Sequence, residues 1–471
     1  MNKVLPTITY LVAFLTSLVF HEMSRFLVWL VFIVALLAML DKLGKGIALR
    51  ESIAVLYILT CLVMPILGYD YYNKSFRLAR VLGYTMSVPE SIYFPYVIPA
   101  VTAFCFALSF PLQAKDISDD VPGITTVIAR IRRILDGERT LGIVIMSVGL
   151  LSFLLNTVLP VSLRYISSIL FFTCFASLLY IYYTPNRPSR SAVLLSFAGF
   201  IILYSISIGM FTIVIYMGIT ISSFFMIGKR IALWRKVAML LSAVLLIIVL
   251  QTTKFTFRSI VFNVGTDNKV KLFGSLFVDN LRNATALQDP QAFWSIYRRT
   301  NQGLIISDVM SRFPMLKPHD DGKVLFQTVL ASFIPRFLWP DKPTADGRFN
   351  MRYYAGKNLN ESTSMNVGPI GEAYASFGVM GGITFIFLIG IFVRWIYGRV
   401  FVIARRMPLI VLWIPVMFYQ ITYSAETDTM QILNSLIKIS FMMALINAVV
   451  PRWFGRKREK APARRMALGL R

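Results

Sequence analysis

Long apolar runs separated by short polar segments dominate the chain. Twelve of them approach the roughly 20 residues that an α-helix needs to cross a bilayer core about 30 Å thick. Such runs predict helices, because a helix satisfies its own backbone N–H and C=O groups where no water can do so. The pattern therefore predicts an all-α polytopic membrane protein. The predicted spans are 4–20, 26–40, 53–69, 93–111, 141–160, 165–183, 192–208, 210–227, 237–253, 374–393, 408–425 and 432–450.

One long hydrophilic stretch interrupts this pattern between the ninth and tenth spans. Inside it, apolar spacing predicts short helices after Asp289-Pro290 and over 324–333. A further amphipathic helix is expected over 124–135, lying on the bilayer surface. The predicted organisation is an N-terminal transmembrane bundle (1–253), one large loop (254–371), C-terminal transmembrane helices (372–450) and a basic tail (451–471).

Composition excludes two broad classes of protein. Hydrophobic residues make up 56% of the 471, and only 15% are charged, against about 25% in an average soluble domain. So little charge cannot cover a water-soluble globule, and so much apolar surface excludes intrinsic disorder. The three cysteines lie inside apolar runs, so no disulfide framework is expected.

The distribution of basic residues predicts the orientation. With both termini in the cytoplasm, the cytoplasmic segments hold 27 Lys and Arg, and the short opposite loops hold five. Cytoplasmic segments are enriched in Lys and Arg, so the long loop is expected outside, which in a bacterial inner membrane means the periplasm. The basic tail then anchors the chain on anionic lipid, and the net charge of +25 does not call for nucleic acid.

The large loop is rich in arginine, whose planar fork suits bidentate contacts to phosphate and carboxylate groups. Its fifteen basic residues outnumber nine acidic ones. A cationic, membrane-adjacent loop fits a lipid-linked pyrophosphate, although many of these side chains are expected to be a solvated face. The arginines are Arg258, Arg282, Arg298, Arg299, Arg312, Arg336, Arg348 and Arg352.

Two histidines are present, and only His319 belongs to the large loop. Its neighbours Asp320 and Asp321 could orient it as a general base toward a hydroxyl. An exposed loop histidine and a metal ligand remain open alternatives. His21 is interpreted as a polar residue of the external turn between the first two spans.

Glu372 is the carboxylate that the sequence singles out. It lies at the rim of the tenth span, where an ionisable group is costly without a partner and is therefore a functional candidate. A loop arginine is the expected partner. Glu426 and Asp428, between the last two spans, are expected on the same external face and could border the same cleft. The glycines of 368–382 are interpreted chiefly as close helix packing.

At this point the residues resemble a known family. The motifs are Ile334-Pro-Arg-Phe-Leu-Trp-Pro-Asp-Lys-Pro343, Asp346-Gly347, and Gly371-Glu-Ala-Tyr374 continuing to Phe377-Gly378. In this order, beside one large loop, they look like the bacterial oligosaccharide repeat-unit polymerases, the Wzy-type enzymes of O-antigen and exopolysaccharide assembly. The resemblance implies a GT-C-like fold of the O-antigen polymerase and ligase type.

The resemblance also implies an activity: inverting, metal-independent glycosyl transfer at the periplasmic face, without a cofactor. The growing glycan would leave its undecaprenyl pyrophosphate and join a new lipid-linked repeat unit, with a polysaccharide co-polymerase as a further partner. An O-antigen ligase and a flippase of lipid-linked oligosaccharide are the competing hypotheses. The expected catalytic residues are Arg336, Glu372 and His319, and the expected substrate-binding residues are Arg258, Arg298, Arg299, Lys342, Arg348 and Tyr374.

Overall fold

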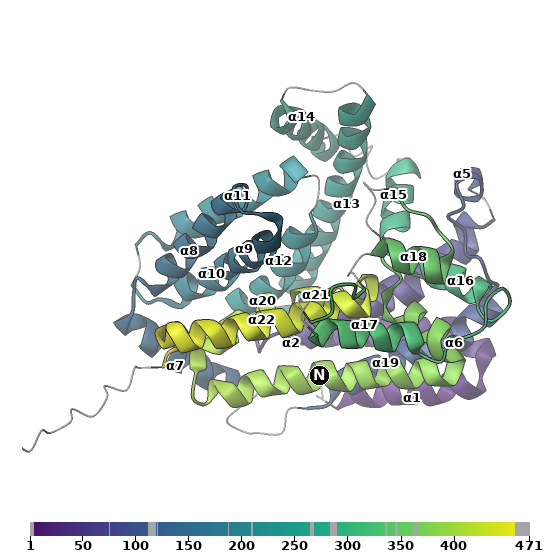
Figure 1. The fold of residues 1–471 in the computed structure, drawn as a ribbon, viewed down its shortest axis with the longest axis horizontal. Helices are drawn as coiled ribbons and strands as arrows, with labels where there is room; N and C mark the ends of the chain where they lie inside the picture. Colours follow the sequence, from purple (N-terminus) through teal and green to yellow (C-terminus); the bar gives the residue numbers. More distant parts are fainter. Residues whose placement is uncertain are drawn as a thin grey trace, which may run out of the picture.

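The fold is known from a computed structural model of the chain (Figure 1). All the regular elements of the described residues are helices. The structure describes residues 4–74, 76–111, 119, 121–186, 188–208, 211–263, 268–282, 290–334, 338–343, 347–360 and 365–456.

The helices follow one another with short connections. Two stretches of the third predicted span, η2 and η3, are π-helical, and the other η elements are 3-10 turns. The elements are α1 Leu5–Val19, η1 His21–Met23, α2 Ser24–Lys42, α3 Leu49–Ile58, η2 Leu59–Val63, α4 Met64–Leu67, η3 Gly68–Tyr72, α5 Arg77–Val81, α6 Glu90–Ser109, α7 Gly123–Gly137, α8 Leu141–Leu155, α9 Val161–Phe171, α10 Thr173–Tyr183, α11 Arg190–Ile208, α12 Thr212–Met226, α13 Leu233–Asn263, α14 Lys269–Arg282, α15 Pro290–Thr300, α16 Gly303–Arg312, α17 Lys323–Phe333, α18 Gly347–Ala355, α19 Gly368–Ala404, η5 Pro408–Trp413, α20 Ile414–Met417, α21 Tyr419–Thr422, η6 Ser424–Glu426, α22 Thr429–Val449 and η7 Pro451–Phe454.

Eight helices of the described chain are long and apolar enough to cross a membrane, or nine if α7 and α8, bent by 84°, form one span. The predicted spans 4–20, 210–227 and 408–425 correspond to shorter apolar helices. An all-helical membrane protein is thus supported, and the count of twelve spans stays a prediction. The eight are His21–Lys42, Leu49–Tyr72, Glu90–Ser109, Ile166–Tyr183, Arg190–Ser207, Leu233–Val261, Gly368–Ala404 and Thr429–Val449.

Segments predicted to share a side of the membrane meet in space. At one end, Arg25 contacts Glu90 at 2.7 Å and Asp70 at 2.8 Å, joining two predicted external segments. At the other end, the buried ammonium group of Lys42 lies 3.0 Å from the carboxylate of Asp119, joining two predicted cytoplasmic turns. The packing therefore follows the predicted alternation of sides.

Helix α19 is broken at Gly378, whose φ of 67° and ψ of −158° are not helical. Only glycine adopts such a conformation readily. The chain also folds back there, because a Cβ on Gly382 would lie 3.3 Å from the carbonyl carbon of Ala373, nine residues earlier. The predicted span 374–393 therefore contains a break, and its membrane-length part begins after Gly378.

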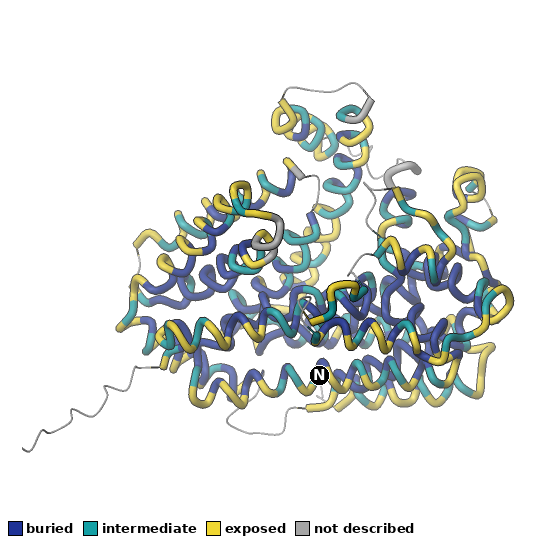
Figure 2. The backbone as a smooth tube through the Cα atoms, viewed as in Figure 1, coloured by how far each residue is buried: buried dark blue, intermediate teal, exposed yellow. Residues whose placement is uncertain are grey.

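The predicted span 408–425 is wrong as a regular helix. It consists of η5, α20, α21 and η6, and nearly all of its side chains are buried (Figure 2). Pro408 and Pro415 have no N–H to donate, so a continuous ladder of hydrogen bonds cannot form. Irregular backbone at membrane depth is tolerated only where protein surrounds it, which is the case here.

The segment 254–371 is not a unit set apart from the bundle. Helix α13 runs through the expected boundary at 253/254, and α14 returns along its end (Figure 1). The other expected boundary, 371/372, falls inside the first part of α19. Helix α16 is buried, and the Gln302 N–H before it donates to the Thr60 carbonyl of η2 at 3.1 Å. The short helices expected after Pro290 and over 324–333 are confirmed as α15 and α17.

The amphipathic helix expected over 124–135 is confirmed as α7, but its apolar face does not lie on lipid. Ile124, Ile131 and Leu135 are fully buried, and the helix packs on α10 and η5. The reason is that the irregular segment η5 leaves an apolar surface that α7 covers. A hydrophobic stripe on a helix indicates that this face is buried, but it does not show whether lipid or protein covers it.

The break in α19 leads to a stability prediction. In Gly378→Ala, the new Cβ would be forced into a left-handed conformation 3.3 Å from His319, so we expect a loss of about 1–3 kcal/mol in the free energy of unfolding. Denaturation of the detergent-solubilised protein measures it. Gly199→Ala is the control, because Gly199 is a helical glycine with open space around it and should gain up to about 1 kcal/mol. Equal stability of the two variants would contradict the break.

Candidate functional site

Two buried carboxylates, Glu372 and Asp428, share one amide group. The Asn350 Nδ2 atom donates to Glu372 Oε1 at 3.0 Å and to Asp428 Oδ2 at 2.8 Å. The exposed fractions of Glu372 and Asp428 are only 1% and 2%. We call these three residues the carboxylate clasp. It joins α18, α19 and the start of α22, three elements that are distant in sequence.

Each carboxylate of the clasp also binds the N-terminus of the other residue's helix. Glu372 Oε2 accepts the N–H of Thr429, the first residue of α22, at 3.0 Å. Asp428 Oδ1 accepts the N–H groups of Val367 and Gly368, where α19 begins, at 2.9 and 3.3 Å. The N-terminus of a helix carries partial positive charge, so it stabilises an anion. Reciprocal capping thus lets two carboxyl groups lie close together at depth.

The expected arginine partner of Glu372 is therefore wrong. Its hydrogen-bond partners among the described residues are Asn350 and the Thr429 N–H. The expectation that Asp428 lies near Glu372 is confirmed by their shared amide. No sequence pattern marks Asn350, because one polar residue in an amphipathic helix is normally a solvated side chain.

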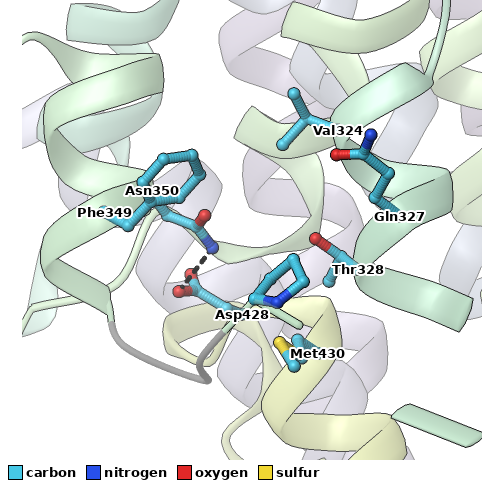
Figure 3. A pocket seen from close by; sticks show the side chains of 8 residues that line it. Val324, Gln327, Thr328, Phe349, Asn350, Asp428 and Met430 are labelled. Atoms are coloured by element: carbon cyan, nitrogen blue, oxygen red, sulfur yellow. Dashed lines mark hydrogen bonds between the residues drawn. The ribbon is translucent and has the colours of Figure 1, made fainter. Parts of the chain in front are cut away.

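A small pocket opens beside the clasp, between α17, α18 and the start of α22 (Figure 3). The volume of the pocket is about 50 Å³, which is enough for a few water molecules. Asn350 and Asp428 belong to its wall, whereas Glu372 is not among the lining residues. The lining residues are Val324, Gln327, Thr328, Pro343, Phe349, Asn350, Asp428 and Met430.

His319 is fixed against the break in α19. Its Nδ1 lies 3.1 Å from the Ala375 carbonyl oxygen. In a regular helix this carbonyl would accept the N–H of the residue four positions later, but the helix is broken at Gly378. A carbonyl can only accept, so Nδ1 carries a proton and the neutral ring presents Nε2 as the acceptor. The ring also lies edge-on to Tyr374, with the ring centres 5.7 Å apart. His319 is thus oriented, half-buried, and separate from the residues that line the pocket.

Arg299 pairs with a buried acid, Glu426, and has two further basic side chains near it. Arg299 Nη2 lies 3.1 Å from Glu426 Oε2, and the Tyr216 hydroxyl donates to Glu426 Oε1 at 3.3 Å. Lys254 and Arg258 are close enough to repel Arg299 electrostatically. The Arg299 side chain is 47% exposed, so the ion pair itself contributes less than about 1 kcal/mol to the free energy of unfolding. We call Lys254, Arg258 and Arg299 the cationic cluster.

Burial perturbs the acid of this cluster. It raises the pKa of Glu426, while Arg299 and the Tyr216 hydroxyl act in the opposite direction by stabilising the carboxylate. Glu426 in turn raises the pKa of Arg299. Lys254, Arg258 and Arg299 thus gather positive charge at one place, with Glu426 paired to Arg299.

Short polar links join the cationic cluster to the clasp. Glu426 and Asp428 are two residues apart. The Asn366 side chain donates to the Glu426 carbonyl at 3.3 Å and accepts from Gln431 at 3.2 Å. Gln302 donates to the Asn366 and Val367 carbonyls at 3.0 and 2.8 Å. The two clusters therefore flank one rigid strip of backbone.

The remaining expected site residues are scattered. Arg298 stacks over the Tyr84 ring at 5.1 Å, on another side of α15 from its neighbour Arg299. Lys342 donates to the Ala331 and Ile334 carbonyls at 2.6 and 2.7 Å, so it binds the C-terminal end of α17. Arg348 is exposed on α18, and Tyr374 packs on Tyr96 within the bundle. Arg336 lies outside the described residues.

Among the described residues, no group of three or more His, Cys, Asp or Glu side chains could hold a metal ion. His319 and Asp320 are adjacent, but Asp320 Oδ1 accepts the Gly322 N–H and its Oδ2 accepts from Tyr353. The aspartate thus supports the loop that carries the histidine.

The fold and this site define the class: a membrane-type helical bundle with a polar, charged centre at one end. Residues 125–403 match a family described as a domain of unknown function (DUF8712). The match covers more than half of the chain, so the protein belongs to this family. It includes the cationic cluster, Asn350 and Glu372, and it ends before Glu426 and Asp428. No curated protein and no solved structure matches the chain.

The clasp leads to a second stability prediction. Asn350→Ala removes the only described side-chain donor that both carboxylates share, so we expect a loss of about 1–3 kcal/mol in the free energy of unfolding. Asn360→Ala, at an exposed asparagine, is the matched control and should change little. Chemical denaturation in detergent compares the two. If the two variants unfolded at the same denaturant concentration, Asn350 would not hold the clasp together.

Proposed function

We propose that the protein polymerises lipid-linked oligosaccharide repeat units at the periplasmic face of a bacterial inner membrane. The observation that carries this proposal is that Glu426, which pairs with Arg299 of the cationic cluster, and Asp428 of the carboxylate clasp are only two residues apart. A glycosyl transfer from a pyrophosphate needs both an anion site and a proton acceptor. The motif resemblance over 334–382 supports the same assignment, with both termini in the cytoplasm.

In the proposed reaction, a hydroxyl oxygen of the acceptor sugar attacks the anomeric carbon of the donor glycan. A new C–O bond forms as the bond between that carbon and the pyrophosphate oxygen breaks, with inversion of configuration. The electron pair leaves with the undecaprenyl pyrophosphate, and the hydroxyl proton passes to a carboxylate. The clasp, with Glu372 and Asp428, supplies that carboxylate, and no metal or cofactor takes part.

Electrostatics gives the cationic cluster its role. The leaving pyrophosphate gains negative charge as the bond breaks, so positive groups beside it stabilise the transition state more than the ground state. We assign this role to Arg258 and Arg299 with Lys254, and to Arg336 by its match to the motif. Arg298, Lys342, Arg348 and Tyr374 are secondary candidates for substrate contacts, and His319 is an alternative base.

Loss of the gene gives the first test. In the encoding bacterium, we expect the ladder of surface glycan lengths to collapse to one repeat unit on its acceptor. Wild-type protein should restore the ladder. Arg299→Ala and Arg336→Ala should restore at most a few per cent of it, because each removes a positive charge that stabilises the leaving pyrophosphate. Arg139→Ala, at an exposed arginine that pairs with Asp136 on the predicted cytoplasmic side, is the control and should restore it fully.

Three other outcomes would overturn this proposal. Long chains that accumulate on undecaprenyl pyrophosphate would identify a ligase. Repeat units that accumulate in the cytoplasmic leaflet would identify a flippase. An unchanged ladder in the deletion strain would mean that the protein does not act in this assembly.

The anion site also has an expected pH dependence. The raised pKa of Glu426 means that its carboxylate takes up a proton at a higher pH than an ordinary glutamate does, which removes the negative charge that faces Arg299. Binding of a dialkyl pyrophosphate diester, whose charge is constant, should therefore tighten from pH 8 to pH 5. The gain should be about tenfold, since removing a unit charge about 6 Å away is worth roughly 1.4 kcal/mol. Calorimetry on the purified protein measures it.

Glu426→Gln is the matched variant for this measurement. It keeps the shape of the side chain and removes its charge, so it should bind the diester tightly and almost equally at both pH values. If the wild type showed no pH dependence, or if Glu426→Gln kept the same dependence, Glu426 would not control the anion site.

A further inference from the structure

The pocket beside the clasp has a chemical character different from that of the cationic cluster. None of the eight residues that line it is basic. Its polar groups are two amides, one hydroxyl and one carboxylate, from Gln327, Asn350, Thr328 and Asp428. Among the described residues, the lining offers a pyrophosphate one carboxylate and no basic side chain. The described lining therefore suits an uncharged group better than an anionic one.

Sugar hydroxyls fit this set of groups. Amides donate and accept hydrogen bonds and carboxylates accept them, which suits neighbouring sugar hydroxyls, and an aromatic or aliphatic surface covers the C–H groups of the ring. Phe349 supplies an aromatic surface, and Val324 and Met430 supply aliphatic ones. The small volume admits the hydroxyl-bearing edge of one ring, and the open mouth leaves room for the rest of a chain.

One polar side chain in the pocket has no other evident use. Thr328 is 6% exposed, and its hydroxyl makes no hydrogen bond with the described residues. In Figure 3 this hydroxyl and the Gln327 side chain lie across the space from Asn350 and Asp428. This hydroxyl is accessible from the pocket, so a group that enters the pocket can form a hydrogen bond with it. The hydroxyl thus points to a ligand independently of the acidic clasp.

We propose that this pocket is a subsite for a neutral sugar, the non-reducing terminal residue of the acceptor oligosaccharide. Asp428 contacts the attacking hydroxyl, and Asn350, Thr328 and Gln327 hold its neighbours. This assignment rests on the proposed function for the identity of the sugar. The two substrates then bind at separate sites: the uncharged acceptor sugar binds in the pocket, and the donor pyrophosphate binds at the cationic cluster.

The test uses a probe that has sugar and no phosphate: the strain's own repeat-unit oligosaccharide, released from its lipid by mild acid. Binding to the full-length protein in lipid nanodiscs is followed by saturation-transfer NMR and calorimetry. We expect wild type to bind, and Thr328→Val and Phe349→Ala to bind about five- to tenfold more weakly, as the loss of one good contact implies. Neither variant removes a hydrogen bond from the fold, so both should remain folded.

Matched controls separate the two places. Thr384→Val, at an exposed threonine on α19, should bind like wild type. Arg299→Ala should also bind the phosphate-free oligosaccharide like wild type, while losing affinity for a dialkyl pyrophosphate diester. The proposal is overturned if wild type does not bind the oligosaccharide, if Thr328→Val binds as well as Thr384→Val, or if Arg299→Ala is the variant that loses it.

Failure of this inference and failure of the proposed function give different results. If the glycan ladder is lost on deletion but Thr328→Val binds normally, polymerisation stands and the pocket assignment falls. If the ladder survives deletion while Thr328→Val and Phe349→Ala weaken binding, the pocket is a sugar site and the polymerase assignment falls.

Discussion

The reciprocal capping of α19 and α22 is the interaction on which the site depends. Glu372 binds the N-terminus of α22, and Asp428 binds the N-terminus of α19. Buried anions are normally costly, but here two helix ends and the Asn350 amide compensate them. The arrangement fixes the relative position of both helices, and it holds two acidic groups beside a pocket without a basic side chain in its wall.

Irregular backbone surrounds this point. The segment 408–426 is broken into short turns, and α19 is interrupted at Gly378. A bundle of regular helices would have no free peptide groups at this depth. The breaks release carbonyls and N–H groups, and specific side chains bind them, such as His319 at the Ala375 carbonyl. The places where regular structure ends are therefore the places where polar chemistry is available.

Charge is separated across the strip of backbone at 424–428. One side carries Arg299 and its basic neighbours around Glu426, and the other carries Asp428 with Asn350. The polar links through Asn366 keep these two sides at a fixed distance. A reaction that needs positive charge at a leaving group and a base at an attacking hydroxyl benefits from such separation, since adjacent opposite charges would neutralise each other.

The sequence by itself determined the helical class, the places of the apolar helices and the candidate acid Glu372, because apolar length and a charge at a span rim are local signals. It also indicated that Arg258 and Arg299 were candidates. Only the tertiary structure decided that Asn350 joins Glu372 to Asp428 and that Lys342 binds a helix end. Those contacts connect distant segments, and no local pattern specifies them; the break at Gly378 is likewise stable only because the surrounding helices pack against it.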